Sequence, residues 1–80
     1  MTLQPAMART VLDLVGLKCP LPALRTGKAL KALRPGDVLV VSASDPLAVI
    51  DIPNLVRETG DRLLAQERAG GVVTFTIARA

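Results

Sequence analysis

The sequence contains no histidine, and this absence removes several common kinds of active site. Zinc sites of the usual type, Ser-His-Asp triads and Cys-His dyads all depend on an imidazole ring. There is also only one cysteine, Cys19, which excludes an internal disulfide and any metal site built from several thiolates. Chemistry at Cys19 therefore has to rely on a thiol whose pKa is set by its surroundings, without a histidine base.

Aromatic residues and long apolar runs are equally scarce. Phe75 is the only aromatic residue among 80, so the core has to consist of Leu, Val, Ile and Ala. No apolar stretch approaches the roughly 20 residues of a membrane span, and residues 1–10 lack the apolar centre of a secretory signal. These features predict a cytoplasmic protein without a membrane partner.

The chain is short, and its charge is moderately positive. A domain of 80 residues is too small to enclose a deep pocket, so we expect surface chemistry with a protein partner. The net charge of +3 and the pI near 9.8 favour acidic partners. The alternative is that the excess of Lys and Arg only keeps the surface solvated.

Hydrophobic periodicity predicts six elements in the order β-α-β-α-β-β. Strands are expected at residues 9–14, 37–44, 62–68 and 72–78, and helices at residues 21–33 and 47–59. Pro53 conflicts with an unbroken second helix, so the regular part of that helix is expected to begin near Asp51. Residues 1–8 are expected to form a flexible tail and residues 9–80 a single domain.

The order of these elements restricts the architecture. A strand–helix–strand unit places its two strands in parallel with a right-handed crossover. The segment Ala69-Gly70-Gly71 predicts a hairpin between the last two strands. Because two helices are too few to cover both faces of a four-stranded sheet, we predict an α+β fold, a two-layer α/β sandwich with both helices on one face.

Cys19 lies between the first predicted strand and the first predicted helix. Pro20 and Pro22 are tolerated only in the first turn of a helix, so they place the helix start just beyond Cys19. The positive end of the helix dipole, the remaining amides and the neighbouring Lys18 all favour an anion there. We therefore predict an exposed sulfur with a pKa below its usual value of about 8.5. Gly16 and the prolines argue against the alternative, a buried cysteine that only fills space.

The amides expected to stabilise the sulfur anion are those of Leu21 and Ala23, since proline has no N–H. The same helix has two distinct faces. One face should pack on the sheet and carries Ala23, Thr26, Leu30 and Leu33. The opposite face carries Leu21, Leu24, Lys28 and Lys31, with Arg25 beside them. We interpret these leucines and cations as a docking patch for a partner with an acidic rim, although scattered exposed leucines are also normal on protein surfaces.

One acidic residue is expected near the cysteine. Asp45 follows the second predicted strand, and the loops after parallel strands meet at one edge of a sheet. Asp45 should therefore lie on the same edge as Cys19. The alternative, which general experience favours, is that Asp45 caps the second helix.

The run from Leu12 to Pro22, LDLVGLKCPLP, resembles the signature of the TusA/SirA-type sulfur carriers, a Cys-Pro-x-Pro motif after a short strand and a Gly-Leu turn. The resemblance spans about residues 10–79. Further matches are Thr26, Lys28-Ala29-Leu30, Pro35-Gly36-Asp37, Ser44-Asp45-Pro46, Asp51-Ile52-Pro53 and Thr59-Gly60. The chain departs from the family at Gly27-Lys28, where two adjacent basic residues are frequent.

This resemblance implies a sulfurtransferase that acts as a stoichiometric carrier on a two-layer sandwich with a mixed sheet. Cys19 would carry a transient persulfide, with Pro20 and Pro22 completing the motif. The sulfur would come from a cysteine desulfurase or a rhodanese-like donor. It would go to an acceptor protein in tRNA thiolation, molybdenum-cofactor assembly or sulfur oxidation. No metal, no other cofactor and no direct contact with nucleic acid are expected, and the free protein is expected to be a monomer.

Two alternatives stay open at this point. A small basic α/β domain can bind nucleic acid, but such domains usually stack bases on aromatic side chains, and Phe75 lies in a predicted core strand. The other alternative is a regulatory interaction domain, in which Cys19 is a redox sensor or has no role.

Overall fold

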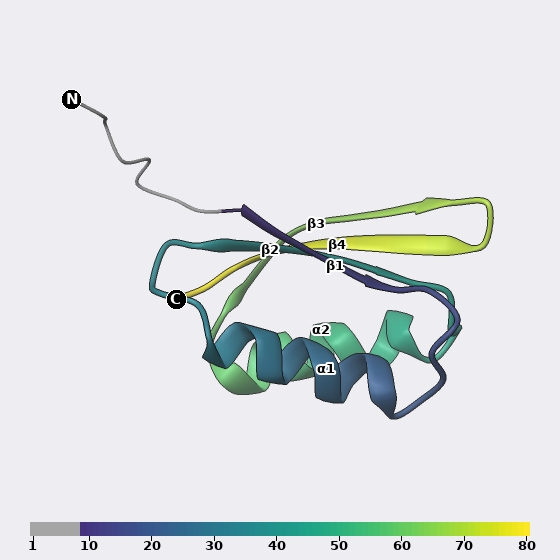
Figure 1. The fold of residues 1–80 in the computed structure, drawn as a ribbon, viewed down its shortest axis with the longest axis horizontal. Helices are drawn as coiled ribbons and strands as arrows, with labels where there is room; N and C mark the ends of the chain where they lie inside the picture. The colour runs from purple at the N-terminus through teal and green to yellow at the C-terminus, as the bar shows by residue number, and fades with distance from the viewer. Residues whose placement is uncertain (1–8) are drawn as a thin grey trace.

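The computed structural model describes residues 9–80, and within them all six predicted elements are present (Figure 1). The strands are β1 (Arg9–Leu14), β2 (Val38–Ala43), β3 (Arg62–Ala69) and β4 (Val72–Ala78). The helices are α1 (Leu21–Lys31) and α2 (Ala48–Thr59). α1 ends at Lys31, two residues before its predicted end at Leu33. The predicted tail, residues 1–8, lies outside the described residues.

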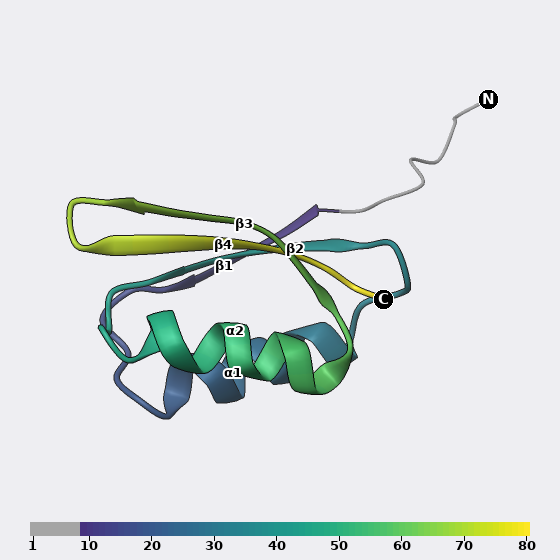
Figure 2. The same ribbon diagram turned by 180° about the vertical axis from the view of Figure 1, so that it is seen from behind.

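The four strands form one mixed sheet in the order β1-β2-β4-β3. β1 and β2 are parallel, and β4 is antiparallel to both of its neighbours, β2 and β3. Both helices lie on the same face of the sheet, as the two opposite views show (Figures 1 and 2). The predicted two-layer α+β sandwich is therefore confirmed. No helix in residues 9–80 is long and apolar enough to cross a membrane.

The core lies between the helices and the two central strands. Alternate residues of β2 and β4 point toward the helices, as expected for strands with one buried face. They are Leu39, Val41 and Ala43 from β2 and Val73, Phe75 and Ile77 from β4. The helices bury Pro22, Thr26 and Leu30 from α1 and Ala48, Ile52 and Val56 from α2. The predicted inward face of α1 is thus confirmed at Thr26 and Leu30.

α2 is continuous through Pro53, so the expectation that its regular part begins near Asp51 is wrong. Pro53 has no N–H and removes one bond to the carbonyl of Val49. The buried residues Ile52 and Val56 lie on either side of the proline and hold the helix against the sheet. Packing therefore outweighs one missing hydrogen bond. As a result, Asp51 lies in the first turn of a regular helix.

The β3–β4 hairpin turns through Gly70 and Gly71, both with positive φ (57° and 81°). Such two-residue turns match the twist of an antiparallel pair, and glycine adopts them without strain. Every residue of β3, an edge strand of the sheet, is exposed, and the tip of the hairpin extends beyond the helical layer (Figures 1 and 2). The register shifts between Leu63 and Ala65, which marks a bulge in this edge strand.

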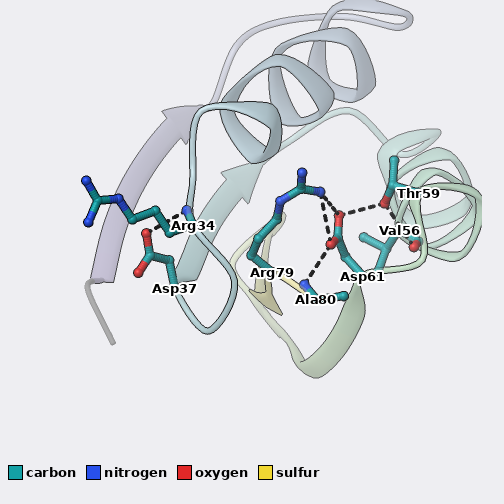
Figure 3. Close-up of polar contacts among 7 residues, drawn as sticks. All are labelled: Arg34, Asp37, Val56, Thr59, Asp61, Arg79 and Ala80. Carbon is teal, nitrogen blue, oxygen red and sulfur yellow. Dashed lines mark hydrogen bonds and ion pairs between the residues drawn. The ribbon is translucent and has the colours of Figure 1, made fainter. Parts of the chain in front are cut away.

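A buried carboxylate ties the end of the chain to the start of β3 (Figure 3). Asp61 accepts hydrogen bonds from the Thr59 hydroxyl at 2.7 Å and from the Ala80 N–H at 2.9 Å. The Arg79 guanidinium lies 3.3 Å from the same carboxylate. Burial alone would raise the pKa of Asp61, but the hydrogen bonds from Ala80, Thr59 and Arg79 and the charge of Arg79 outweigh it and lower that pKa below its ordinary value.

The backbone closes the same end of the sheet. The N–H of Gly36 donates to the Arg79 carbonyl, and the N–H of Arg79 donates to the Asp37 carbonyl, both at 2.8 Å. The Asp37 carboxylate accepts a further bond from the N–H of Arg34 at 3.0 Å, as Figure 3 shows. These hydrogen bonds close this end of the sheet, and the loops that follow β1 and β2 lie at the opposite end.

Candidate functional site

Cys19 lies at the end of the sheet where the two parallel strands terminate. Leu14 and Ala43, the last residues of β1 and β2, are paired in register, so the loops that follow them are neighbours. The N–H of Gly16 in the first loop donates to the Ser44 hydroxyl in the second at 2.9 Å. Gly16 has a φ of 92°, a conformation that a side chain would strain. The glycine therefore lets the first loop turn toward the second.

The two prolines of the motif have different environments. Pro22 lies in the first turn of α1 and is buried in the core, whereas Pro20 is exposed at the N-cap position. The peptide bond between Cys19 and Pro20 is cis. Pro22 thus anchors the start of α1, and Cys19 stays exposed at the surface. The predicted exposure of the only thiol is confirmed.

The Asp45 carboxylate connects the two loops. It accepts a hydrogen bond from the N–H of Cys19 and another, at 3.1 Å, from the N–H of Leu47. The structure therefore places Asp45 beside Cys19, on the same edge of the sheet. The alternative that Asp45 caps α2 is wrong, because Leu47 is the N-cap residue and no side chain caps this helix. The bonds from Cys19 and Leu47, together with the charge of Lys18, lower the pKa of Asp45.

A second carboxylate contacts the sulfur itself. The Cys19 thiol donates a hydrogen bond to Asp51 Oδ2, with 3.2 Å between sulfur and oxygen. Asp51 is half-buried in the first turn of α2, 32 residues away along the chain. The sequence-based reasoning missed this residue, although it begins one of the segments that match the family. An acidic residue in the helical turn after Asp45 was the available signal.

The two carboxylates reverse the expected electrostatics at the sulfur. The pKa of Cys19 is raised above its ordinary value, first by the hydrogen bond to Asp51, then by desolvation and by the negative charges of Asp51 and Asp45. The prediction that the start of α1 lowers this pKa is therefore wrong. The N–H of Leu21, expected to stabilise the anion, instead donates to the Lys18 carbonyl at 2.9 Å.

The predicted docking patch on α1 is at the surface. Leu21 is 41% and Leu24 is 63% exposed, and the basic members of the patch, Arg25, Lys28 and Lys31, are exposed as well. Two further apolar side chains at the start of α2, Leu47 and Ile50, are 50% and 59% exposed. The sequence-based reasoning did not include these two residues. Apolar side chains from the first turns of both helices are thus exposed near Cys19, and the basic residues of the patch follow along α1, with Lys28 and Lys31 in its last turn.

Cys19 is exposed, and it does not line either of two shallow hollows on the described surface. One is bounded by Asp45, Ile50 and Arg68, between the start of α2 and the overhanging hairpin. The other lies between the helices, over Gly27 and Leu55. The site is therefore an open surface, which suits a protein substrate better than an enclosed metabolite.

Comparison with known proteins connects this geometry to a family. Residues 10–79 match the family model described as sulfurtransferase TusA. A putative sulfur carrier protein of Neisseria meningitidis is 45% identical over 71 residues, which cover 89% of this chain and 96% of the relative. The sulfur carrier protein TusA of Allochromatium vinosum is 43% identical over 68 residues, which cover 85% and 90%.

The fold gives the same result. The crystal structure of a SirA-like protein from Desulfitobacterium hafniense superimposes with a TM-score of 0.75 at 26% identity. The match covers 86% of this chain and 95% of that protein. The sequence match extends over nearly all of the described residues, and the structural match has the same small α+β domain. The chain belongs to the TusA family of sulfur carrier proteins.

Proposed function

We propose that the protein accepts sulfur as a persulfide on Cys19 and relays it to an acceptor protein. The observation that supports this most directly is the exposure of the only thiol, at a loop–helix junction of a sulfur-carrier fold. A carrier needs a sulfur that two different proteins can reach in turn. An open surface meets this requirement, whereas an enclosed pocket does not.

The relay consists of two exchange reactions without net oxidation. In loading, the Cys19 sulfur bonds to the outer sulfur of the donor persulfide, and the S–S bond of the donor breaks. The proton of the Cys19 thiol ends on the departing donor sulfur, so a thiol and a persulfide anion give a persulfide anion and a thiol. In release, the thiolate of the acceptor attacks the outer sulfur, and Cys19 departs.

We propose a cysteine desulfurase or a rhodanese-like protein as the donor and a second protein as the acceptor, in the cytoplasm. The docking patch of Leu21, Leu24, Arg25, Lys28 and Lys31 would bind an acidic-rimmed surface on either partner. Leucines beside the sulfur supply apolar area, and the cations around them supply orientation. The free protein would be a monomer.

Intact mass after incubation with a cysteine desulfurase and cysteine tests this function. We expect a gain of one sulfur atom that a reductant removes. Cys19→Ser should abolish the gain and leave the melting temperature nearly unchanged, because the side chain is exposed. Sulfur that stays bound to the Cys19→Ser protein would contradict the assignment of Cys19.

The nucleic-acid alternative receives little support. Phe75, the only aromatic residue of the sequence, is fully buried between the sheet and the helices. It is therefore not available to stack on a base.

A further inference from the structure

We infer that Asp51 is a positioning residue for Cys19: its carboxylate holds the sulfur as a neutral thiol in the free protein and makes exchange favour partners that bring a positive charge to the site. The first half of this inference concerns the chemistry of the free protein. The second half rests on the proposed function, since it describes how a sulfur donor or acceptor is selected.

The position of Asp51 is fixed by its helix. Its N–H donates to the Leu47 carbonyl at 2.9 Å, and the next residue, Ile52, is fully buried in the core. The carboxylate therefore approaches the sulfur from a rigid element, at 3.2 Å from Cys19 Sγ. On the other side, the Asp45 carboxylate holds the N–H of Cys19. One carboxylate thus fixes the backbone of the cysteine, and the other fixes its sulfur.

The hydrogen bond exists only while the sulfur carries its proton. A thiol donates to a carboxylate, but a thiolate has nothing to donate and would face a negative charge at contact distance. Two charged groups act on the sulfur, Asp51 from α2 and Asp45 from the loop before α2, and the charge of the preceding residue, Lys18, acts on Asp45. The first turn of α1, residues 21–24, contributes no charge. Two negative groups against one positive group favour the neutral thiol.

The charges around Cys19 also indicate which charges a partner protein would carry on its docking surface. The acidic groups, Asp45 and Asp51, contact Cys19 directly, and the exposed basic residues of α1 begin with Arg25, in the second turn of that helix. A complementary surface carries a cation opposite Asp51 and acidic groups opposite α1. A cation that pairs with Asp51 removes the repulsion that the thiolate would feel. Sulfur exchange at Cys19 is therefore fastest when the partner protein carries a positive group beside its own reacting sulfur.

The first test measures the free thiol without any sulfur donor. The rate of alkylation by iodoacetamide, followed by intact mass from pH 6 to pH 10, reports the fraction of thiolate. Asp51→Asn should move the midpoint of this profile to lower pH. For every pH unit by which the midpoint falls, the reaction at pH 7 should become about tenfold faster.

Two further variants make this test specific. Asp51→Ala should shift the profile in the same direction, although alanine cannot donate to the sulfur as an asparagine amide can. Glu58→Gln, at an exposed position further along α2, is the matched control and should leave the profile unchanged. A profile that is the same in wild type and in both Asp51 variants overturns the inference.

The second test measures the preference for charge. Cys19 is allowed to exchange with cystamine, which is cationic, and with 3,3′-dithiodipropionate, which is anionic, at low salt. Wild type should react several-fold faster with the cationic disulfide, and Asp51→Asn and added salt should both reduce this ratio. A ratio that Asp51→Asn does not change overturns the proposed selection. Neither test uses a desulfurase. If the protein gives the expected result in both tests but gains no sulfur from a desulfurase, the proposed function is contradicted and the role of Asp51 is not.

Discussion

Single residues decide the chemistry at the exposed end of this molecule. The loop that carries Cys19 is held by the Asp45 carboxylate through a backbone bond, so the position of the sulfur does not depend on the sulfur's own contacts. Asp51 then acts on the sulfur directly, and the pKa of Cys19 is raised as a consequence. The inferred protonated thiol would be protected from indiscriminate oxidation, because the thiolate is the reactive form.

Thr26 is a residue whose side chain carries an energetic cost. Its hydroxyl is fully buried under the sheet, and the oxygen has no hydrogen-bond partner within the described structure. Thr26→Val, which replaces the hydroxyl by a methyl group of similar size, should raise the free energy of unfolding by about 1 kcal/mol. Urea denaturation measures this change. Thr76→Val, at a half-buried position of β4, is the control and should change stability by less than about 0.5 kcal/mol.

A loss of stability in Thr26→Val would mean that the hydroxyl makes an interaction in solution. Sulfur loading should be the same in wild type and in this variant, because Thr26 lies on the inward face of α1 and Cys19 is at the surface.

At the scale of elements, the two helices meet where α1 lacks a side chain. A Cβ atom at Gly27 would lie 3.6 Å from both terminal methyl groups of Leu55 in α2, which is an ordinary van der Waals contact. The departure from the basic pair of the family thus lies over the seam between the helices. The effect of this glycine on the stability of α1 follows from that contact.

Gly27→Ala should stabilise the protein by about 0.5–1 kcal/mol, because alanine is the better helix former and its methyl group finds space against Leu55. The matched control is Gly60→Ala. Gly60 ends α2 with a φ of 80°, and the N–H of Asp61 there donates to the Val56 carbonyl at 3.1 Å. Alanine is strained in this conformation, so this variant should be less stable than wild type. Thermal unfolding of both variants checks the opposite signs.

At the scale of the whole molecule, the two ends of the sheet differ in structure. The end with Cys19 is open, apolar and charged, while the other end is closed by Asp61, Arg79 and the terminal backbone. Because the pairing register places Arg9, Val38 and Ala78 together at the closed end, changes there leave the site undisturbed. We therefore expect substitutions at the closed end to change stability without changing the reactivity of Cys19.

The closed end predicts how stability depends on pH. The pKa of Asp61 is lower in the folded protein than in the unfolded chain, where it is about 3.9. The stabilisation is therefore complete above that value and is lost as the pH falls through the folded-state pKa. Asp61→Asn should lower the free energy of unfolding by about 1–3 kcal/mol at pH 7, since it removes charged hydrogen bonds from a buried position.

Denaturation curves from pH 2 to pH 7 test this expectation. The difference between wild type and Asp61→Asn should shrink as the pH falls below about 4. Glu67→Gln, on the exposed strand β3, should follow the wild-type curve throughout. A difference that stays constant from pH 7 to pH 2 would show that the charge of Asp61 does not contribute.

Sequence reasoning reached most of the fold because the signals for it are local. Alternating residues predicted β4, the prolines predicted the start of α1, and the glycine pair predicted the hairpin, since each depends on backbone preferences of a few neighbouring residues. The effect of Pro53 on α2 was predicted wrongly because local backbone preferences disfavour a proline inside a helix. The burial of Ile52 and Val56 outweighs these preferences. Local rules fail where packing supplies more free energy than a single hydrogen bond.

The sequence by itself left one candidate for the sulfur-carrying atom, since it contains one thiol and no histidine. It also determined that this thiol precedes a helix, because Pro20 and Pro22 leave few other conformations. Only the tertiary structure decided which groups surround the sulfur and in which direction they move its pKa. Asp51 is 32 residues from Cys19, and their contact exists because α1 and α2 pack on the same face of the sheet with their first turns at the same edge. Electrostatic interactions depend on distance through space, and distance along the chain does not contain that information.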